Sequence, residues 1–367
     1  MEKYINEAIA ALQADQKEIK VFVALDGYID KIQKVVARTP ASNEREYFHS
    51  LATFGQQIQQ SAGRSSQMEI VSEVVKFGGN APIMAEALAA LGIPNYCIGT
   101  FGEAAIDSVF QAMHDDVELV SLGDAATTNA LEFDDGKLML SEVVAFKKID
   151  WAFLKSKVGL DRLTKWIQEV DLIALVDWMN LPHATVIWNG ILEEIIIPNQ
   201  LKTPIFFDLC DPKKKTDEQI LEVLQLISRY NEYTSATLGL NENEAIQIYD
   251  GLKRANGETQ IQTELMDKCQ YIFQAMNLDT LVVHPINGCY LIQRHQAIYV
   301  PGKVVTKPKI STGGGDNFNA GFCYGLLYDL SSEAAMLIGI ATSGAYVQNG
   351  QSPSKDQLID YLKTFRI

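Results

Sequence analysis

The sequence predicts an α/β fold in which a central, mostly parallel β-sheet is flanked by helices on both faces. Short runs of apolar and β-branched residues alternate along the chain with segments of helical periodicity. A turn signal between two alternating segments predicts a smaller β element beside the main sheet. With 367 residues, of which 47% are hydrophobic, the chain is long enough to bury a large core.

Six apolar runs are predicted to be strands of the main sheet, at 21–25, 95–101, 171–178, 203–209, 234–240 and 279–285. Helices are predicted between them, for example over 82–92, 217–230 and 316–330. This alternation suits parallel strands, because each parallel pair needs a crossover connection. Apolar residues also recur at helical spacing in 1–20, which predicts a helical extension before a single body over 21–367.

Residues 124–147 fit this alternation poorly and are predicted to form a β-hairpin. Asp134, Asp135 and Gly136 supply its turn, because such residues tolerate the backbone angles of a tight hairpin. Together with residues 30–50, the hairpin is predicted to form a small β lid on the α/β body.

Composition excludes several classes of function. A net charge of -15 opposes binding to nucleic acid, since nonspecific affinity for DNA or RNA rests on Lys and Arg. The five cysteines are odd in number and widely spaced, with no C-x-x-C pair, so reduced core residues are expected. No signal peptide or membrane-spanning run is apparent, so we expect a cytoplasmic protein without a membrane partner.

The segment STGGGDNFNAGF at 311–322 carries the strongest chemical signal. Gly313, Gly314 and Gly315 allow the backbone to approach a ligand, and the helix that follows directs unpaired N–H groups toward an anion. Asp316 at the start of this helix is placed to accept a proton, although a helix-capping role explains the same residue. Neither a Walker A motif nor a G-x-G-x-x-G fingerprint is present, which disfavours P-loop and dinucleotide-binding proteins.

This segment resembles the C-terminal signature D-T-x-G-A-G-D-x-F-x-x-G of the ribokinase-like (PfkB) carbohydrate kinases. Gly313, Gly315, Asp316, Phe318 and Gly321 match it in register, whereas Ile310, Ser311 and Gly314 depart from it. The resemblance implies a ribokinase-like fold, with Asp316 as the catalytic base. It also implies an anion hole formed by Gly313, Gly314 and Gly315.

Two further segments are similar to the acceptor-binding motifs of the same family. In ALDGYID, the residues taken alone favour a turn acid for Asp26 and a helix-capping acid for Asp30, but the resemblance implies that Asp30 binds sugar hydroxyls beside Asp26. Gly78, Gly79 and Asn80 precede an Ala-rich helix, and the resemblance implies that this loop lies against the acceptor. Pro82 and Ile83 depart from the pattern, so the resemblance does not fix the acceptor, and fructose-like sugars, ribose, sugar acids and nucleosides all stay open.

The resemblance also implies a nucleotide and metal site. In the segment NENE, capping alone explains Asn241 and Glu244, but the family motif implies that Asn241 contacts the nucleotide and that Glu244 organises Mg²⁺ through water. Gly288, Thr342 and Asn349 are further candidates for nucleotide binding. The residues His284, Pro285 and Ile286 depart from the usual nucleotide loop of the family.

Together these motifs predict an ATP-dependent phosphotransferase that phosphorylates a hydroxyl of a sugar or sugar-like molecule. Two alternatives stay open, a nucleoside kinase of the same family and a noncatalytic sugar or nucleoside sensor on the same fold. The expected cofactors are Mg²⁺ and ATP as phosphoryl donor, with a monovalent cation as a further candidate. The expected partners are the acceptor and the nucleotide, and the resemblance implies a homodimer through the lid.

Overall fold

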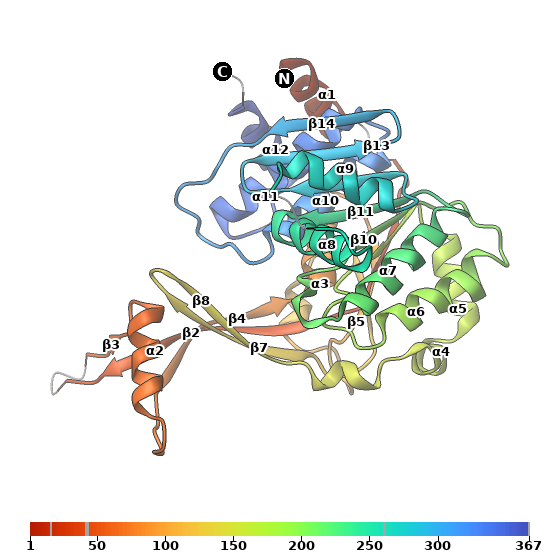
Figure 1. The fold of residues 1–367 in the computed structure, drawn as a ribbon. Coiled ribbons are helices and arrows are strands. Elements are labelled where there is room, and N and C mark those ends of the chain that lie inside the picture. Colours follow the sequence, from red (N-terminus) through yellow and green to blue (C-terminus); the bar gives the residue numbers. More distant parts are fainter. Residues whose placement is uncertain (15–16, 41–43, 260–261, 366–367) are drawn as a thin grey trace.

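The computed structural model describes residues 1–14, 17–40, 44–259 and 262–365, which form an α/β body and a projecting lid (Figure 1). The body contains a nine-stranded sheet. Its strands lie in the order β14 (Gln296–Pro301), β13 (Gly288–Gln293), β12 (Thr280–His284), β11 (Ala236–Asn241), β10 (Ile205–Asp208), β9 (Leu172–Leu175), β1 (Val21–Ala24), β5 (Asn95–Gly99) and β6 (Val117–Ser121). Neighbours from β12 to β6 pair in parallel, whereas β13 and β14 pair antiparallel at one edge.

Helices cover both faces of this sheet. The face that includes Phe22 and Ala24 of β1 packs against α4 (Trp151–Val158), α5 (Leu160–Gln168), α6 (Ala184–Ile191), α7 (Asp217–Tyr230), α8 (Glu242–Ala255) and α9 (Leu265–Ala275). The opposite face, with Val21 and Val23, packs against α1 (Glu2–Gln13), α3 (Asn80–Ala90), α10 (Gly314–Leu327), α11 (Ser332–Asn349) and α12 (Lys355–Lys363). Burial on both faces explains why the central strands are continuously apolar. Short helical turns η1 (Phe110–Ala112), η2 (Val144–Lys148), η3 (Leu192–Ile196) and η4 (Pro212–Lys214) complete the body.

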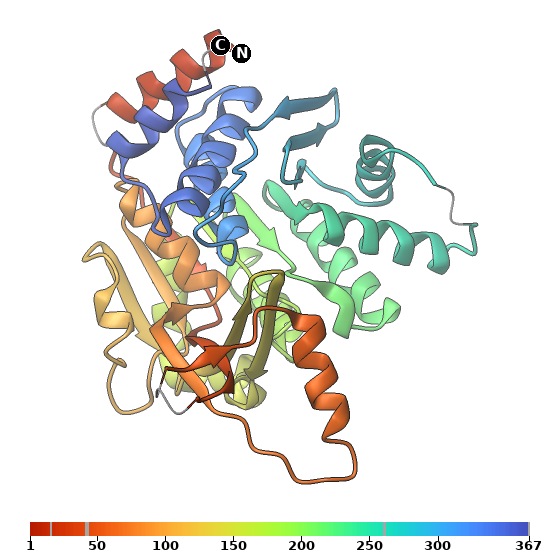
Figure 2. The same cartoon turned by 90° about the vertical axis from the view of Figure 1, so that its left-hand side faces the viewer.

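The N-terminal helix α1 packs against α11 and α12, and Figure 2 shows both termini at the same end of the body. The Tyr324 hydroxyl of α10 donates to the Ala11 carbonyl at 3.1 Å. Glu7 accepts hydrogen bonds from the backbone N–H and the hydroxyl of Ser331, at 2.7 and 2.8 Å. The predicted helix within 1–20 is therefore part of the helical layer, and β1 begins at Val21.

The lid consists of β2 (Tyr28–Arg38), β3 (Glu46–Tyr47), α2 (Leu51–Gln60), β4 (Ile70–Gly78), β7 (Ala126–Phe133) and β8 (Gly136–Glu142), and it extends to one side of the body (Figure 1). The β7–β8 hairpin turns at the predicted residues 134–136. The lid differs from the predicted ranges in including β4, which pairs antiparallel with β2. Residues 144–147 of the predicted range belong to η2 instead. The sequence did not predict β4, because the adjacent residues Val74 and Val75 break the alternation of apolar and polar side chains that marks a strand. Both valines are half exposed in the structure.

Helix α10 is held in place by close packing on α11. A methyl group on Gly321 would lie 2.5 Å from the Thr342 hydroxyl and 2.8 Å from the Ile338 carbonyl oxygen. Because the latter is backbone, the helices can accommodate a side chain only by moving apart. This contact therefore fixes the distance between α11 and the helix that carries the glycine motif.

We expect Gly321→Ala to lower the free energy of unfolding by about 1–3 kcal/mol, the usual cost of overpacking. Gly251→Ala in α8 is the matched control, because its added methyl would meet its nearest atom at an ordinary 3.5 Å. The control is expected to leave stability unchanged or to raise it by up to about 1 kcal/mol through helix propensity. Urea unfolding of both variants tests this contact, and equal effects would contradict it.

Candidate active site

A row of polar residues lies along the carboxyl edge of the main sheet. Asp208, Asn241 and His284 end the adjacent strands β10, β11 and β12, whereas Asp177 and Asp26 come two residues after β9 and β1. The five strands are neighbours in the order β12, β11, β10, β9 and β1. In open α/β sheets, ligands bind outside the carboxyl ends of the strands, so this edge is the candidate active site.

The glycine motif supplies the start of α10 at this edge. Gly313 is the N-cap residue and has a left-handed backbone with φ of 92°, which favours glycine. Its placement is supported by the Tyr346 hydroxyl, which donates to the Thr312 carbonyl at 2.9 Å. Within the described residues, no hydrogen-bond acceptor faces the N–H groups of Gly315 and Asp316. These two groups are available to an anion.

The carboxyl group of Asp316 is buried beside these N–H groups, with 8% of the residue exposed. Burial raises its pKa well above the usual range, and the negative charges of Asp208, Asp26, Asp177 and Glu244 raise it further. The structure therefore gathers these carboxyl groups around the start of α10. Asp316 is poised to hold a proton in the absence of a cation.

Asp26 holds the start of α3 in place. Its carboxylate accepts hydrogen bonds from the backbone N–H groups of Asn80 and Ala81, both at 2.7 Å. A side chain on Gly79 would lie 2.5 Å from the same carboxylate, and Gly79 also has a φ of 101°, so the loop needs glycine here. Burial raises the pKa of Asp26 to about 7, although the two N–H groups favour its ionised form. Asp26 thus positions the predicted acceptor loop.

Asp30 lies where the lid meets the body, in β2, and only 4% of the residue is exposed. It stands in register with Lys76 of β4 on one side and Thr128 of β7 on the other. Burial raises the pKa of Asp30, while the Lys76 charge and a hydrogen bond from Thr128 lower it. A side chain on Gly78 would overlap the Asp30 carboxylate, so this glycine leaves the room that Asp30 occupies.

The predicted metal site adopts a capping box at the start of α8. Asn241 Nδ2 and the Asn241 backbone N–H donate to the Glu244 carboxylate at 2.6 and 2.8 Å, and Asn241 Oδ1 accepts from the Glu244 N–H at 3.0 Å. Burial raises the pKa of Glu244 well above its usual value, and the charges of Asp208 and Asp211 raise it further. In the described part of the chain, no group of three His, Cys, Asp or Glu residues is arranged as a ready metal cage. A cation here would complete its coordination with water and phosphate oxygens.

The predicted nucleotide-binding residues lie in different surroundings. Thr342 is fully buried between α10 and α11, where its hydroxyl donates to the Ile338 carbonyl at 2.7 Å. This placement gives Thr342 a packing role and does not support nucleotide contact. Asn349 is exposed at the end of α11, and its carbonyl accepts from Lys309 Nζ at 3.1 Å, close to the segment that leads into the glycine motif. Gly288 begins β13 after the turn that departs from the family pattern.

His284, the residue before that turn, is partly buried behind the glycine motif. Its ring stacks on Phe318 of α10 with the centroids 4.4 Å apart. Burial lowers the pKa of His284 to about 4, so the ring is neutral at physiological pH. A side chain on Gly315 would lie 3.4 Å from this ring. His284 therefore supports the glycine motif from beneath.

Several site residues were missed in the sequence. Asp177 has a left-handed backbone with φ of 55°, accepts from Asn180 Nδ2 at 2.7 Å, and leaves Oδ2 buried without a partner in the described part of the chain. Asn319 of α10 donates to the Asp208 carboxylate at 2.5 Å. In the sequence, Asp177 is only an aspartate near the end of the predicted strand over 171–178, and the strand order that makes it a site residue comes from the fold. Asn319 gave no signal, because an asparagine three residues after Asp316 in a predicted helix is not by itself evidence of a site.

Comparison with known proteins agrees with this geometry. The sequence matches the prokaryotic ketohexokinase family over residues 1–365, including the N-terminal helix. The chain belongs to the prokaryotic ketohexokinase family. It is 25% identical to a ketohexokinase of Haloferax volcanii over 343 residues, which cover 92% of this chain and 89% of that protein.

Solved structures show the same fold. A probable sugar kinase from Rhizobium etli superimposes with a TM-score of 0.65 at 15% identity, covering 95% of this chain and 99% of that one. Arabidopsis thaliana ribokinase, solved with ribose and ATP, gives a TM-score of 0.62 at 15% identity, covering 94% of this chain and 98% of the other. The predicted ribokinase-like fold and the prediction of a small-molecule kinase that phosphorylates sugars with ATP are confirmed. No helix in the described ranges has both the length and the apolar character to cross a membrane.

The buried carboxyl groups make stability depend on pH. A carboxyl group with a raised pKa binds more protons in the folded than in the unfolded state, so stability should fall as pH rises through the folded pKa. For Asp26 this pKa is about 7. His284 acts in the opposite direction, but only between about 4 and its unfolded value of about 6.5.

We therefore expect the free energy of unfolding, measured in EDTA without ligands, to fall as pH rises from about 5 to the Asp26 pKa of about 7, because the carboxyl groups with raised pKa outnumber the single histidine. Burial and the Asp26 charge raise the pKa of Asp177 well above its usual value, so Asp177→Asn should flatten this decline. The exposed Asp360→Asn is the control and should keep the wild-type slope. Denaturant unfolding across this pH range is the measurement. A wild-type stability that rises with pH would contradict the assignment of protonated carboxyl groups.

Proposed function

We propose that this protein transfers the γ-phosphoryl group of ATP to a hydroxyl of a ketohexose, with Asp316 as the general base. The observation that carries the proposal is the position of the Asp316 carboxyl group at the start of α10, beside the unpaired N–H groups of Gly315 and Asp316. A proton acceptor and an anion hole lie on one rigid helix. Phosphoryl transfer needs this combination, because its catalysis is mostly positioning and electrostatic stabilisation.

The acceptor would bind between the lid and the carboxyl edge of the sheet. Asp30 and Asp177 are the candidates to accept hydrogen bonds from its hydroxyls, because both are buried carboxyl groups beside the start of α3 and the lid. Asp26 would contribute indirectly by holding the Gly79–Asn80 loop.

The carboxyl groups also suit Mg²⁺. The Asp208 charge raises the pKa of the buried Glu244, and a divalent cation would relieve this repulsion. When bound, Mg²⁺ would supply positive charge that neutralises the donor phosphates and favours ionised carboxylates. Because both Glu244 oxygens already accept from Asn241, Glu244 would hold the ion through water.

The transfer step follows from these positions. Asp316 accepts the proton of the acceptor hydroxyl as its oxygen attacks the γ-phosphorus, and the bond from that phosphorus to the bridging oxygen of ATP breaks. ADP leaves with the electron pair of this bond. The N–H groups of Gly315 and Asp316 donate to the oxygens of the group in transfer, where charge must be stabilised. Closure of the lid would exclude water as a competing acceptor.

Asp316→Asn keeps the size of the side chain but removes the proton acceptor. General bases contribute typically about 10²–10⁴-fold, so kcat should fall by at least about 10², while KM for both substrates changes much less. Asp329→Asn is the matched control, because Asp329 is an exposed residue after α10 with 90% of its side chain accessible. Coupled measurement of ADP formation on folded variants tests this, and activity of Asp316→Asn within a few-fold of wild type would exclude it as the base.

The acceptor itself can be identified by a panel of ketohexoses, ribose and nucleosides, each assayed for ADP formation and for thermal stabilisation. The proposal predicts turnover with a ketohexose. Turnover with nucleosides alone would indicate the nucleoside kinase alternative, and stabilisation without any turnover would indicate a sensor.

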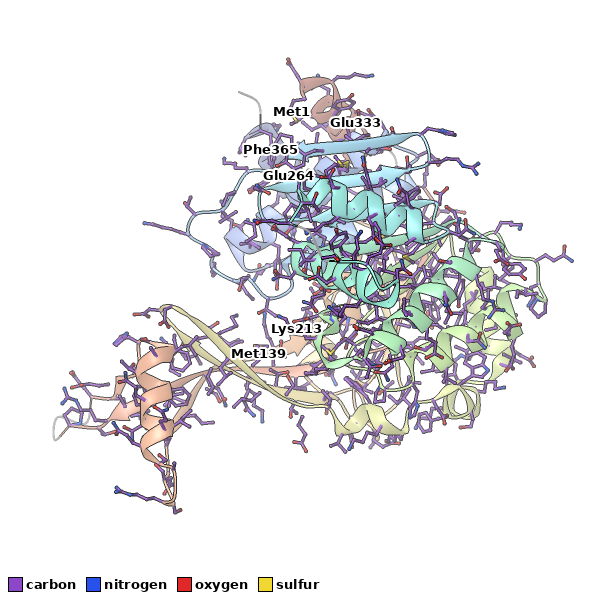
Figure 3. The ribbon with its side chains drawn as sticks, in the orientation of Figure 1. Met1, Met139, Lys213, Glu264, Glu333 and Phe365 are labelled. Atoms are coloured by element: carbon purple, nitrogen blue, oxygen red, sulfur yellow. The ribbon has the colours of Figure 1, made fainter. Side chains whose placement is uncertain are left out.

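We further propose a homodimer formed through the lid. Apolar side chains of its two outer strands are about half exposed, namely Ile70, Val74 and Val75 of β4 and Met139 and Leu140 of β8. Figure 3 shows the lid side chains standing out on both sides of its strands, away from the body. A monomer would leave this apolar surface in water, whereas pairing with a second lid would bury it.

Leu140→Glu should convert a wild-type dimer to a monomer, because it places a charge in the proposed contact. Val186→Glu, at a similarly exposed position in α6 of the body, should leave the dimer intact. Light scattering coupled to size-exclusion chromatography gives both masses. A monomeric wild-type protein, or a dimeric Leu140→Glu variant, would contradict the lid interface.

A cytoplasmic location is also proposed, and a nucleic acid partner is not expected. All five cysteines are free, and four of them are buried, which suits a reducing compartment. The net charge of -15 opposes contact with nucleic acid phosphates.

A further inference from the structure

A lysine of the lid reaches the loop that opens the anion hole. Lys137 is the second residue of β8, just after the hairpin turn. Its Nζ donates to the Thr312 hydroxyl at 3.1 Å, a contact between residues 175 positions apart in the chain. Only 21% of the Lys137 side chain is exposed, although most of β8 is accessible to water. The lid is thus connected to the glycine motif through one cationic group.

The contact places this ammonium group at the start of α10. Thr312 directly precedes Gly313, the N-cap residue of the helix in which the N–H groups of Gly315 and Asp316 have no hydrogen-bond partner among the described residues. The Lys137 charge also acts on the acceptor side, because it favours the ionised form of Asp30. Lys137 therefore lies between the residue proposed to bind the acceptor and the groups proposed to bind the phosphoryl group.

The acidic surroundings of the site favour such a cation. Asp26, Asp177, Asp208, Glu244 and Asp316 surround the carboxyl edge, and none of them forms a salt bridge within the described residues. A polyphosphate brings further negative charge to the same place. The glycine motif offers N–H groups but no cationic side chain of its own.

We propose that Lys137 is a catalytic residue, delivered by the lid, that contacts the transferring phosphoryl group and stabilises its charge. This inference rests on the proposed function. An ammonium group has three donors, so Lys137 can exchange the Thr312 hydroxyl for a phosphoryl oxygen as the lid closes over the acceptor. Its proton stays on nitrogen throughout, and the transfer to Asp316 is unchanged. Lid closure would thus complete the catalytic site as well as exclude water.

The alternative is that Lys137 only stabilises the lid, through an ion pair with its neighbour on β7. Its Nζ lies 3.4 Å from Glu132 Oε1, and the two residues are directly opposite each other in the hairpin. Such a pair contributes about 0–1 kcal/mol to stability when exposed. Lys34 of β2 provides a matched comparison, because it pairs with Glu73 of β4 at 2.7 Å and forms no hydrogen bond or ion pair with the body among the described residues.

The test compares Lys137→Met and Lys137→Arg with Lys34→Met in ADP formation and in single-turnover phosphoryl transfer. Loss of one charge-stabilising donor typically costs about 10²–10³ in kcat, so Lys137→Met should lose at least about 10² with little change in acceptor KM. Lys137→Arg should retain more of the activity, and Lys34→Met should stay within about twofold of wild type. Calorimetry adds a readout besides turnover: Lys137→Met should bind ADP with aluminium fluoride and acceptor at least about tenfold more weakly, yet bind ADP alone normally.

The outcomes separate this inference from the proposed function. If wild type is active and Lys137→Met matches it within about threefold, the lysine is structural, while the proposed kinase reaction stands. An equal loss in Lys34→Met and Lys137→Met would also overturn the inference, because it would indicate general damage to the lid. If wild type transfers no phosphoryl group to any acceptor, both the proposed function and the role of Lys137 are wrong.

Discussion

The burial of several carboxyl groups at one edge of the sheet, without bonded cations, is the constraint on which the active site depends. Parallel strands bring Asp26, Asp177 and Asp208 side by side, and α10 adds Asp316 to them. Ionising all of these groups together in a buried region is unfavourable, so the ligand-free site must retain protons. Positive charge that arrives with the substrates can release these protons. The buried carboxyl groups therefore favour binding of a polyphosphate that brings a metal ion with it.

Hydrogen bonds and helix packing hold these carboxyl groups in fixed positions. Asp26 is held by two backbone N–H groups of α3, Asp208 by Asn319, and the start of α10 by its packing on α11 and by Tyr346. The lid, by contrast, contributes strands whose apolar residues are half exposed. A rigid edge of the sheet thus faces a separate element that carries Asp30 and Lys137. This division matches a reaction in which the acceptor must enter before the site closes.

The sequence was sufficient to predict the fold and the glycine motif, because both depend on local patterns. Continuous apolar strands and intervening helices require a covered parallel sheet, and Gly313 to Asp316 form one unbroken segment. β4 was missed since Val74 and Val75 break its alternation. Thr342 was misleading, because its distance from the motif along the chain gave no sign that its hydroxyl is buried against Ile338.

Asp177 and Lys137 show what the sequence could not reveal. An aspartate after a strand is common, and Asp177 became a site residue only once β9 was placed between β1 and β10. No sequence pattern distinguishes Lys137, because its contact with Thr312 spans 175 positions. Both depend on how distant segments meet, which no local periodicity specifies.

The most direct test of this account is the number of protons released when the preformed complex of Mg²⁺ and ADP binds at pH 7. Calorimetry in buffers of different ionisation enthalpy measures this number, and the Asp177→Asn, Glu244→Gln double variant corrects for protons released by the nucleotide. Because a cation lowers the pKa of nearby carboxyl groups, the account predicts that wild type releases more protons than the double variant. Equal proton release by the two proteins would contradict the claim that buried, protonated carboxyl groups form the site.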